Sequence, residues 1–144
     1  MTVFAKTLSR FEDGAYAALR IASGLMFAFH GVQKVLGVFT TQTPPVGSQI
    51  WVGGLIEMLG GLAIAAGLFM RCAAFVASGT MAVAYSQFHW RFAFGKEFFP
   101  AINKGELALV YAFLFLYFAC RGAGRFSVDA LRSTTSADPD RPAP

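Results

Sequence analysis

The chain alternates four long apolar stretches with short polar segments, a pattern typical of membrane-spanning helices. A helix needs roughly 20 apolar residues to cross the hydrocarbon layer of a bilayer. Charged residues gather between the stretches and at their edges. The pattern therefore predicts four spans, over residues 15–39, 50–69, 72–90 and 103–120.

The composition points to the same class of protein. Hydrophobic residues make up 56% of the 144 positions and charged residues only 14%, with a mean hydropathy of +0.53. Because soluble domains carry roughly 25% charged residues, this composition excludes a soluble enzyme. It favours an all-α fold, an integral membrane four-helix bundle. The net charge of +4 is not concentrated on one face or tail, so no nucleic-acid partner is expected.

The distribution of Lys and Arg predicts how the bundle is oriented. Loops on the cytoplasmic side of a membrane carry an excess of positive residues. One side of the predicted bundle carries Lys6, Arg10, Arg71, Arg121, Arg125, Arg132 and Arg141, and the other carries Arg91, Lys96 and Lys104. Both termini are therefore predicted to be inside.

The chain is too short for a second domain and divides into one folded unit with two flanks. Residues 1–14 have apolar side chains at helical spacing beside Lys6 and Arg10, which predicts an amphipathic lead on the cytoplasmic membrane surface. Residues 15–131 form the predicted transmembrane domain. The polar, proline-rich residues 132–144 are expected to be a disordered cytoplasmic tail.

Charged residues inside the spans are the strongest functional signal. A charge at the centre of a span costs roughly 2.5 to 3.5 kcal/mol on insertion scales, so these side chains must face the bundle interior or an interface. With a rise of about 1.5 Å per helical residue, Lys34, Glu57 and Glu106 lie at a similar depth to Tyr85 below the outer surface. Arg20 lies nearer the inner side, where it either snorkels or binds the ends of neighbouring helices.

These depths define a candidate site in the outer third of the bundle. One-turn spacing places His30 beside Lys34 and His89 beside Tyr85. Glu57 and Glu106 are the candidate catalytic residues, because carboxyl groups take up and release protons. The candidate cofactor-binding residues donate hydrogen bonds or line the mouth of the site. They are His30, Lys34, Tyr85, His89 and Asn103.

A quinone fits this pattern, because its headgroup carries two carbonyl groups and its apolar remainder can lie between helices or in lipid. The same residues also permit other interpretations. Lys34 and Glu57 can be an internal ion pair that only holds helices in register. The two histidines lie at different depths, which disfavours haem, and the spacing matches no metal-ligand motif. A small-solute transporter is disfavoured by the lack of visible internal repeats.

The order of these residues resembles the DoxX family of small membrane proteins. The first span matches R-x3-G-x2-F-x2-H-G-x2-K at Arg20, Gly24, Phe27, His30, Gly31 and Lys34. The second matches G-x2-E-x2-G-G and G-x3-R at Gly54, Glu57, Gly60, Gly61, Gly67 and Arg71. The fourth begins with N-K-G-E-x-A-x2-Y, at Asn103, Lys104, Gly105, Glu106, Ala108 and Tyr111. The chain then resembles the family's G-x-G-R-x-S-x-D at Gly122, Gly124, Arg125, Ser127 and Asp129.

The resemblance covers residues 15–131 and implies a four-helix protein of the bacterial inner (plasma) membrane. The family is named after a small subunit associated with quinone-reducing thiosulfate oxidation, and other members are linked to quinone handling and oxidative stress. Cys72 and Cys120 form no pair for sulfur chemistry, and we expect both to be core residues.

The leading hypothesis is a protein that binds a quinone-like headgroup near the outer face and supports membrane redox chemistry, alone or as a subunit. The alternative is a non-catalytic membrane partner that assembles or stabilises a redox complex. Whether the protein is an enzyme by itself stays open. The partners considered are the lipid bilayer, a redox protein and further copies of the chain.

Overall fold

The computed structural model describes residues 3–135, and within this range every regular element is a helix, as the all-α prediction requires. Residues 1–2 and 136–144 lie outside the described range. The α-helices are α1 (Val3–Ser9), α2 (Glu12–Leu36), α3 (Gln49–Ala66), α4 (Met70–Ala84), α5 (Pro100–Asn103), α6 (Glu106–Arg121) and α7 (Val128–Thr135). A π-helix, η1 (Tyr85–Trp90), continues α4, and a 3₁₀ turn, η2 (Lys96–Phe98), precedes α5.

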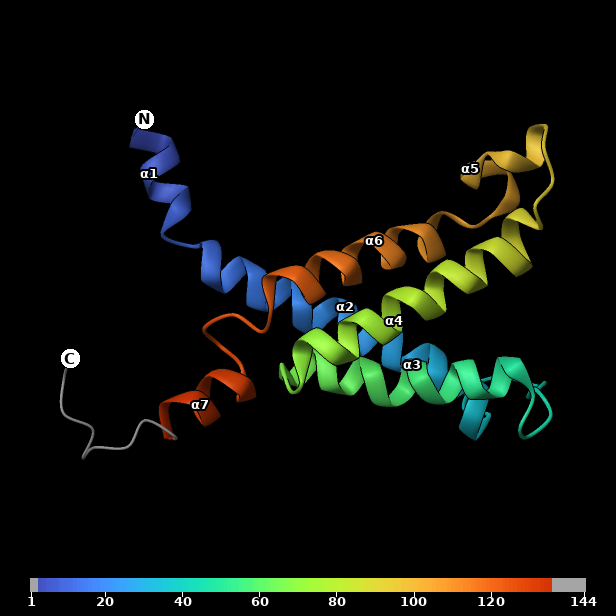
Figure 1. Ribbon diagram of the computed structural model, residues 1–144, viewed down its shortest axis with the longest axis horizontal. Helices are drawn as coiled ribbons and strands as arrows, with labels where there is room; N and C mark the ends of the chain where they lie inside the picture. The colour runs from blue at the N-terminus through green and yellow to red at the C-terminus, as the bar shows by residue number, and fades with distance from the viewer. Residues whose placement is uncertain (1–2, 136–144) are drawn as a thin grey trace.

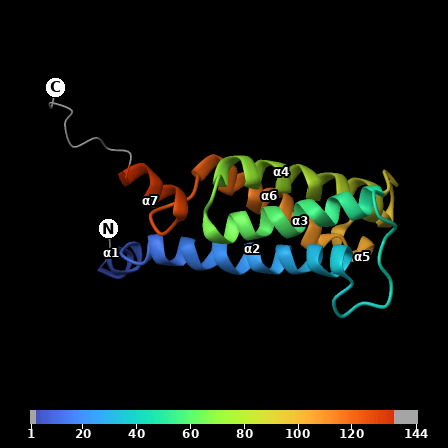
Figure 2. The same ribbon diagram turned by 90° about the horizontal axis from the view of Figure 1, so that it is seen from below.

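The four longest of these helices, α2, α3, α4 and α6, lie side by side. α2 packs on α3, α3 on α4, and α4 on α6. Figure 1 shows α4 between α3 and α6, and Figure 2 shows α2 running along α3. α1 and α7 lie at one end, here called the terminal end, and the loop over residues 37–48 lies with α5 at the other, the loop end (Figure 2).

The first two predicted spans agree closely with α2 and α3. Gly37 ends α2 by adopting a left-handed backbone with φ 70°, and Gly67 ends α3 in the same way with φ 69°. Ser48 begins α3, because its hydroxyl accepts a hydrogen bond from the backbone N–H of Trp51. Both helices are long and apolar enough to cross a membrane.

The other two predicted spans differ more from the helices. Residues 72–90 combine α4 with the π-helix η1, so the polar aromatic segment from Tyr85 to Trp90 is wound more widely than an α-helix. α6 begins at Glu106, three residues after the predicted start at Asn103, because Lys104 ends α5 in a left-handed conformation with φ 59°, and it extends to Arg121. α7 occupies residues 128–135, so the part of the predicted tail that is described is helical, and the rest lies outside the described residues.

The long helices expose apolar side chains and bury two charged ones, which differs from the surface of a soluble protein. Arg20 and Glu57 are 1% and 2% exposed, whereas large apolar side chains cover the outside of all four long helices. An apolar exterior around buried charges is the arrangement required in lipid. Examples of exposed apolar side chains are Leu25, Phe29, Leu59, Leu62, Phe75, Val76, Val110 and Phe113.

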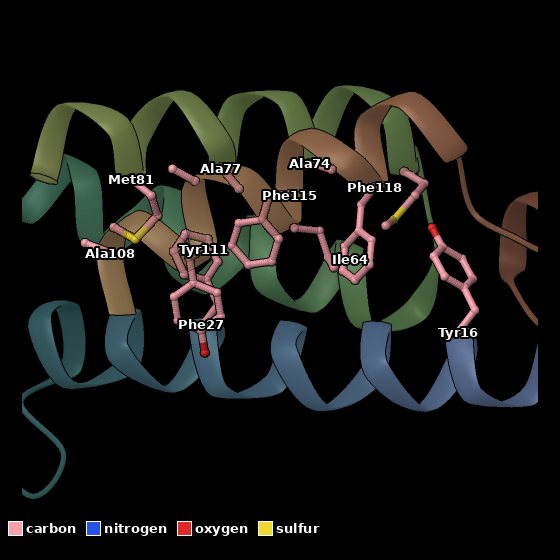
Figure 3. Packing of buried hydrophobic residues seen from close by; sticks show 12 residues of the cluster. Tyr16, Phe27, Ile64, Ala74, Ala77, Met81, Ala108, Tyr111, Phe115 and Phe118 are labelled. Atoms are coloured by element: carbon pink, nitrogen blue, oxygen red, sulfur yellow. The ribbon is translucent and has the colours of Figure 1, made fainter. Parts of the chain in front are cut away.

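The buried core runs along the centre of the four helices. Figure 3 shows side chains from α2, α3, α4 and α6 meeting there. Phe27 of α2 contacts both Tyr111 and Phe115 of α6, with ring centroids 5.7 and 4.8 Å apart, so these contacts join the first long helix to the last.

Polar contacts tie the terminal end together. The Arg20 guanidinium donates hydrogen bonds to the carbonyl groups of Ile64 and Phe126, so the interpretation in which it binds helix ends holds. The Asp129 carboxylate accepts hydrogen bonds from the backbone N–H groups of Phe69 and Met70, which caps the start of α4. The family-like residues at the chain's end therefore have a structural role.

Both cysteines are exposed, so the expectation that they are core residues was wrong. Cys72 lies near the start of α4 and Cys120 near the end of α6. The buried residues are instead two positions away, Ala74 after Cys72 and Phe118 before Cys120. Helix rotation, which the hydropathy of the side chain does not fix, decides which of these residues is buried.

Candidate functional site

A cavity of about 580 Å³ lies in the half of the structure nearer the loop end. It is lined by α2, α3, α4, η1 and α6, so all four long helices contribute to its wall. Most of its wall is apolar, with side chains such as Phe27, Ile56 and Leu107. The polar or charged side chains in the wall are His30, Lys34, Gln49, Glu57, Thr80, His89, Lys104 and Tyr111.

An ion pair between α2 and α3 forms one wall of this cavity. Lys34 Nζ lies 2.5 Å from Glu57 Oε1 and 2.7 Å from Oε2, so the ammonium group donates to both carboxylate oxygens. The side chain of Glu57 is 3% exposed and that of Lys34 is 35% exposed. The carboxylate is therefore the deep member of the pair, and the ammonium group has a third N–H that this pairing leaves available.

A second hollow of about 250 Å³ lies beside the first at the loop end. His30 and Lys34 line both spaces, so these two side chains stand between the main cavity and the smaller hollow. The smaller hollow has the polar wall expected next to water, and Gln33, Thr40 and Gln42 contribute to it. No side-chain hydrogen bond joins His30 to another residue in the described range.

The π-helix brings a histidine to the opposite wall. A π-helix places residues on faces that an α-helix would not, and such segments often occur at functional sites. His89 lines the cavity, and its Nδ1 lies 3.3 Å from the carbonyl oxygen of Asn103. Tyr85 stacks on His89 with ring centroids 6.5 Å apart. Tyr85 and Asn103 thus contact the His89 ring but do not line the cavity themselves.

Glu106 is not part of this arrangement. It lies in the first turn of α6 but is exposed, and it is not among the residues that line either space. Of the candidate residues, the structure therefore brings together His30, Lys34, Glu57 and His89, with Tyr85 and Asn103 behind them. Among residues 3–135, no three His, Cys, Asp or Glu side chains lie close enough to hold a metal ion.

Tyr111 also lines the cavity, although the sequence places it only in the family-like motif and not among the candidate site residues. Tyr111 is 3% exposed, and its hydroxyl has no hydrogen-bond partner among the described residues. Figure 3 shows this hydroxyl directed toward α2 beside Phe27. A tyrosine in the middle of a predicted span was the available signal, because a buried hydroxyl normally requires a partner.

The lining also includes two glycines with room around them. A Cβ added at Gly53 of α3 or at Gly79 of α4 would meet no atom within 4 Å. By contrast, a Cβ on Gly54 would come within 2.7 Å of Lys34 Cβ. The glycines of α3 therefore serve two purposes: some let α2 approach, and Gly53 widens the cavity.

Comparisons with known proteins identify the family. The family model described as DoxX matches residues 15–90, which include His30, Lys34, Glu57, Tyr85 and His89 but not the predicted fourth span. A protein of Haemophilus influenzae described as an uncharacterized protein is 40% identical over 126 residues, which cover 85% of this chain and 93% of the relative. No solved structure gives a significant match. Since the family model matches more than half of the chain, this protein belongs to the DoxX family.

Proposed function

We propose that this protein is a four-helix, multi-pass protein of the bacterial inner membrane, with both termini in the cytoplasm, that binds a quinone-like headgroup and supports membrane redox chemistry. The observation that carries this proposal is the cavity whose apolar wall contains the Lys34–Glu57 ion pair. Binding sites for small organic molecules are mostly apolar, with a few polar groups that fix orientation.

The membrane placement is supported by the surface of the long helices. Away from the helix ends their exposed side chains are mostly apolar, while the buried charges face one another or backbone carbonyl groups. α2 and α3 pass the length and hydropathy criteria for spans, and α4 with η1 forms one continuous helical segment from residue 70 to 90. The shared location of α1 and α7 is consistent with both termini being on one side (Figure 2).

The donor set in the wall suits a headgroup with carbonyl or hydroxyl groups. The cavity volume of about 580 Å³ lies within the usual range for small-molecule sites, roughly 300 to 1,000 Å³. Lys34 has one N–H beyond the two directed at Glu57, and ring nitrogens are offered by His30 on the same helix and by His89 on η1. A quinone would supply the electron-accepting chemistry that the chain's own side chains lack.

The roles of the protein's residues follow from their positions. Lys34 pairs with the Glu57 carboxyl group and donates a hydrogen bond to the headgroup. Glu57 is the titratable carboxyl group at the cavity wall, so it is the group that holds or releases a proton. His30 and Lys34 stand between the cavity and the polar hollow, which gives the carboxyl group a connection to the loop end.

Quinone content measures this proposal directly. The protein is purified in mild detergent, extracted with organic solvent, and its quinone per protein is quantified by mass spectrometry against an unrelated four-span protein. We expect near-stoichiometric quinone in the wild type and loss of most of it in Glu57→Gln. The matched control is Glu97→Gln, at a half-buried carboxyl outside the cavity, and it should retain the quinone.

The ion pair itself favours a second function, that of a non-catalytic membrane partner of a redox complex. A buried ion pair can serve only to fix helix register. In that case quinone would not exceed the level in the unrelated protein, and Glu57→Gln would act on thermal stability alone. Those two results together would replace the quinone proposal with the structural one.

A further inference from the structure

The cavity reaches the outer surface of the protein between α3 and α4. Its wall contains exposed side chains from both helices, Val52 of α3 and Val83 of α4, which are 44% and 45% exposed. Gly79 of α4 is exposed as well and also lines the cavity. The same residues therefore belong to the cavity wall and to the lipid-facing surface, which means that the cavity is open on this side.

Backbone contacts explain why the gap lies between α3 and α4 and not between α2 and α3. On α3, Gly54 and Gly61 are in contact with α2, so that pair of helices is closed. Gly53 and Gly79 touch nothing within 4 Å at the position where a side chain would begin. Two helices that each present a glycine without a neighbour leave a channel between them.

The edge of this opening is apolar. Thr80 lines the cavity, but its hydroxyl donates a hydrogen bond to the Val76 carbonyl group in its own helix. The one hydrogen that this hydroxyl can donate is thus used within α4. Ile56, Val52 and Val83 complete an edge that suits a hydrocarbon chain and offers little to a polar solute.

The loop-end side of the opening is bridged. The Gln49 side-chain amide donates a hydrogen bond of 2.7 Å to Gln87 Oε1, which links α3 to η1 above the gap. This bridge lies between the opening and the loop end, so the opening faces the bilayer and not the water beyond the helices.

We propose that the gap between α3 and α4 is a lateral entrance that holds the hydrocarbon tail of a lipid-like ligand while its headgroup lies at Lys34 and Glu57. This inference rests on the proposed function and adds to it the class of ligand, an amphiphile with an isoprenoid or alkyl chain. The tail leaves the cavity past Gly53 and Gly79, and the ligand reaches the site from the membrane.

Two quinone probes with the same headgroup, one with a tail and one without, separate the contribution of the tail to binding from that of the headgroup. The probes are decylubiquinone and its tailless parent, 2,3-dimethoxy-5-methyl-1,4-benzoquinone. Affinity is measured in lipid nanodiscs at one fixed lipid concentration, by quenching of Trp51 and Trp90 fluorescence. Because the lipid concentration is the same in every sample, partitioning of the probe into lipid cancels in the ratio of two variants' apparent affinities.

The variants are Gly79→Leu and Gly53→Leu, which fill the gap from either helix where the structure leaves room. The matched control is Gly60→Leu, because Gly60 also lies on α3 with nothing within 4 Å but does not line the cavity. The Cβ of a side chain at each of these three positions meets no atom within 4 Å, so we expect thermal stability to stay near that of the wild type. Should one variant not fold, the other fills the same gap.

We expect Gly79→Leu and Gly53→Leu to weaken decylubiquinone binding about tenfold or more, since several methylene groups lose their burial. Binding of the tailless probe should change less than about threefold, and Gly60→Leu should change neither. Equal loss of both probes, or no loss of decylubiquinone, overturns the lateral entrance and leaves the proposed function standing. If neither probe binds the wild type, the proposed function fails, and the entrance fails with it.

Discussion

Gly24 of α2 and Gly61 of α3 lie backbone to backbone. A Cβ on Gly24 would come within 2.7 Å of the Gly61 carbonyl oxygen, and a Cβ on Gly61 within 2.6 Å of the Gly24 carbonyl oxygen. Two helical turns away, a Cβ on Gly31 would likewise meet the Gly54 carbonyl oxygen, whereas a Cβ on Gly54 would meet the side chain of Lys34. Without a hydrophobic driving force in lipid, such close contact of helix backbones is a main source of helix association.

Gly24→Ala should therefore destabilise the protein despite the better helix propensity of alanine. The added methyl group meets backbone atoms of Ala65 and Gly61, which cannot move aside as a side chain can. Overpacking of this kind costs about 1 to 3 kcal/mol. Thermal denaturation in detergent measures the effect. The control is Gly14→Ala in the same helix, where the methyl group meets nothing and stability should rise slightly.

The two members of the ion pair should differ in their effect on stability. Lys34→Met leaves the carboxylate of Glu57 buried without a partner, at a cost of about 3 kcal/mol or more. Glu57→Gln should cost less, because the Lys34 side chain is partly exposed and can reach the smaller hollow. Thermal denaturation of both variants and of the double variant gives the comparison. Equal losses in the two single variants would contradict this account of the pair.

Asp129 is expected to stabilise the start of α4, although it lies about 60 residues later in the sequence. Phe69 occupies the N-cap position of α4, and its side chain makes no capping hydrogen bond. The Asp129 carboxylate supplies both bonds, so Asp129→Ala should cost about 1 to 2 kcal/mol. Thermal denaturation should show no comparable change in Asp13→Ala, at an exposed carboxylate in the first turn of α2. Similar losses in both variants would remove the capping role.

The exposed cysteines report the orientation of the chain. Cys72 and Cys120 lie at the terminal end, so a membrane-impermeant maleimide should label them in inside-out vesicles and leave them unlabelled in intact spheroplasts. Thr41→Cys, in a variant without the two native cysteines, places the thiol in the loop at the other end and should reverse the result. Labelling of the native cysteines from outside would invert the proposed topology.

The sequence predicts the helices well because their limits depend on local chemistry. Gly37 and Gly67 end helices through backbone conformations that glycine adopts easily, and Ser48 begins one through its hydroxyl. It also predicts that Lys34 and Glu57 lie at the same level of the bundle, since this level follows from the helical rise, and the ion pair between them agrees. The structure shows these two residues as an ion pair, which both the binding-site and the helix-register interpretations use.

The sequence predicts less well the direction in which a side chain faces. Glu106 has the expected position along its helix but faces outward, because rotation of α6 is fixed by the packing of Tyr111 and Phe115 against Phe27. His89 reaches the cavity through a π-helix, which no periodic pattern of apolar residues indicates. Contacts between helices, and not properties of one helix, decide both cases.

The partners of the buried charges have a consequence for how the protein enters the membrane. Lys34 finds its counter-charge on α3, and the guanidinium group of Arg20 finds the carbonyl group of Ile64 on the same helix. In the proposed topology either helix alone would expose an unpaired charge to hydrocarbon, whereas together Lys34 and Glu57 neutralise each other and Arg20 is hydrogen-bonded. If the protein spans the membrane as proposed, the α2–α3 hairpin is the smallest unit that enters it at low cost, and insertion of α2 is expected to wait for synthesis of α3.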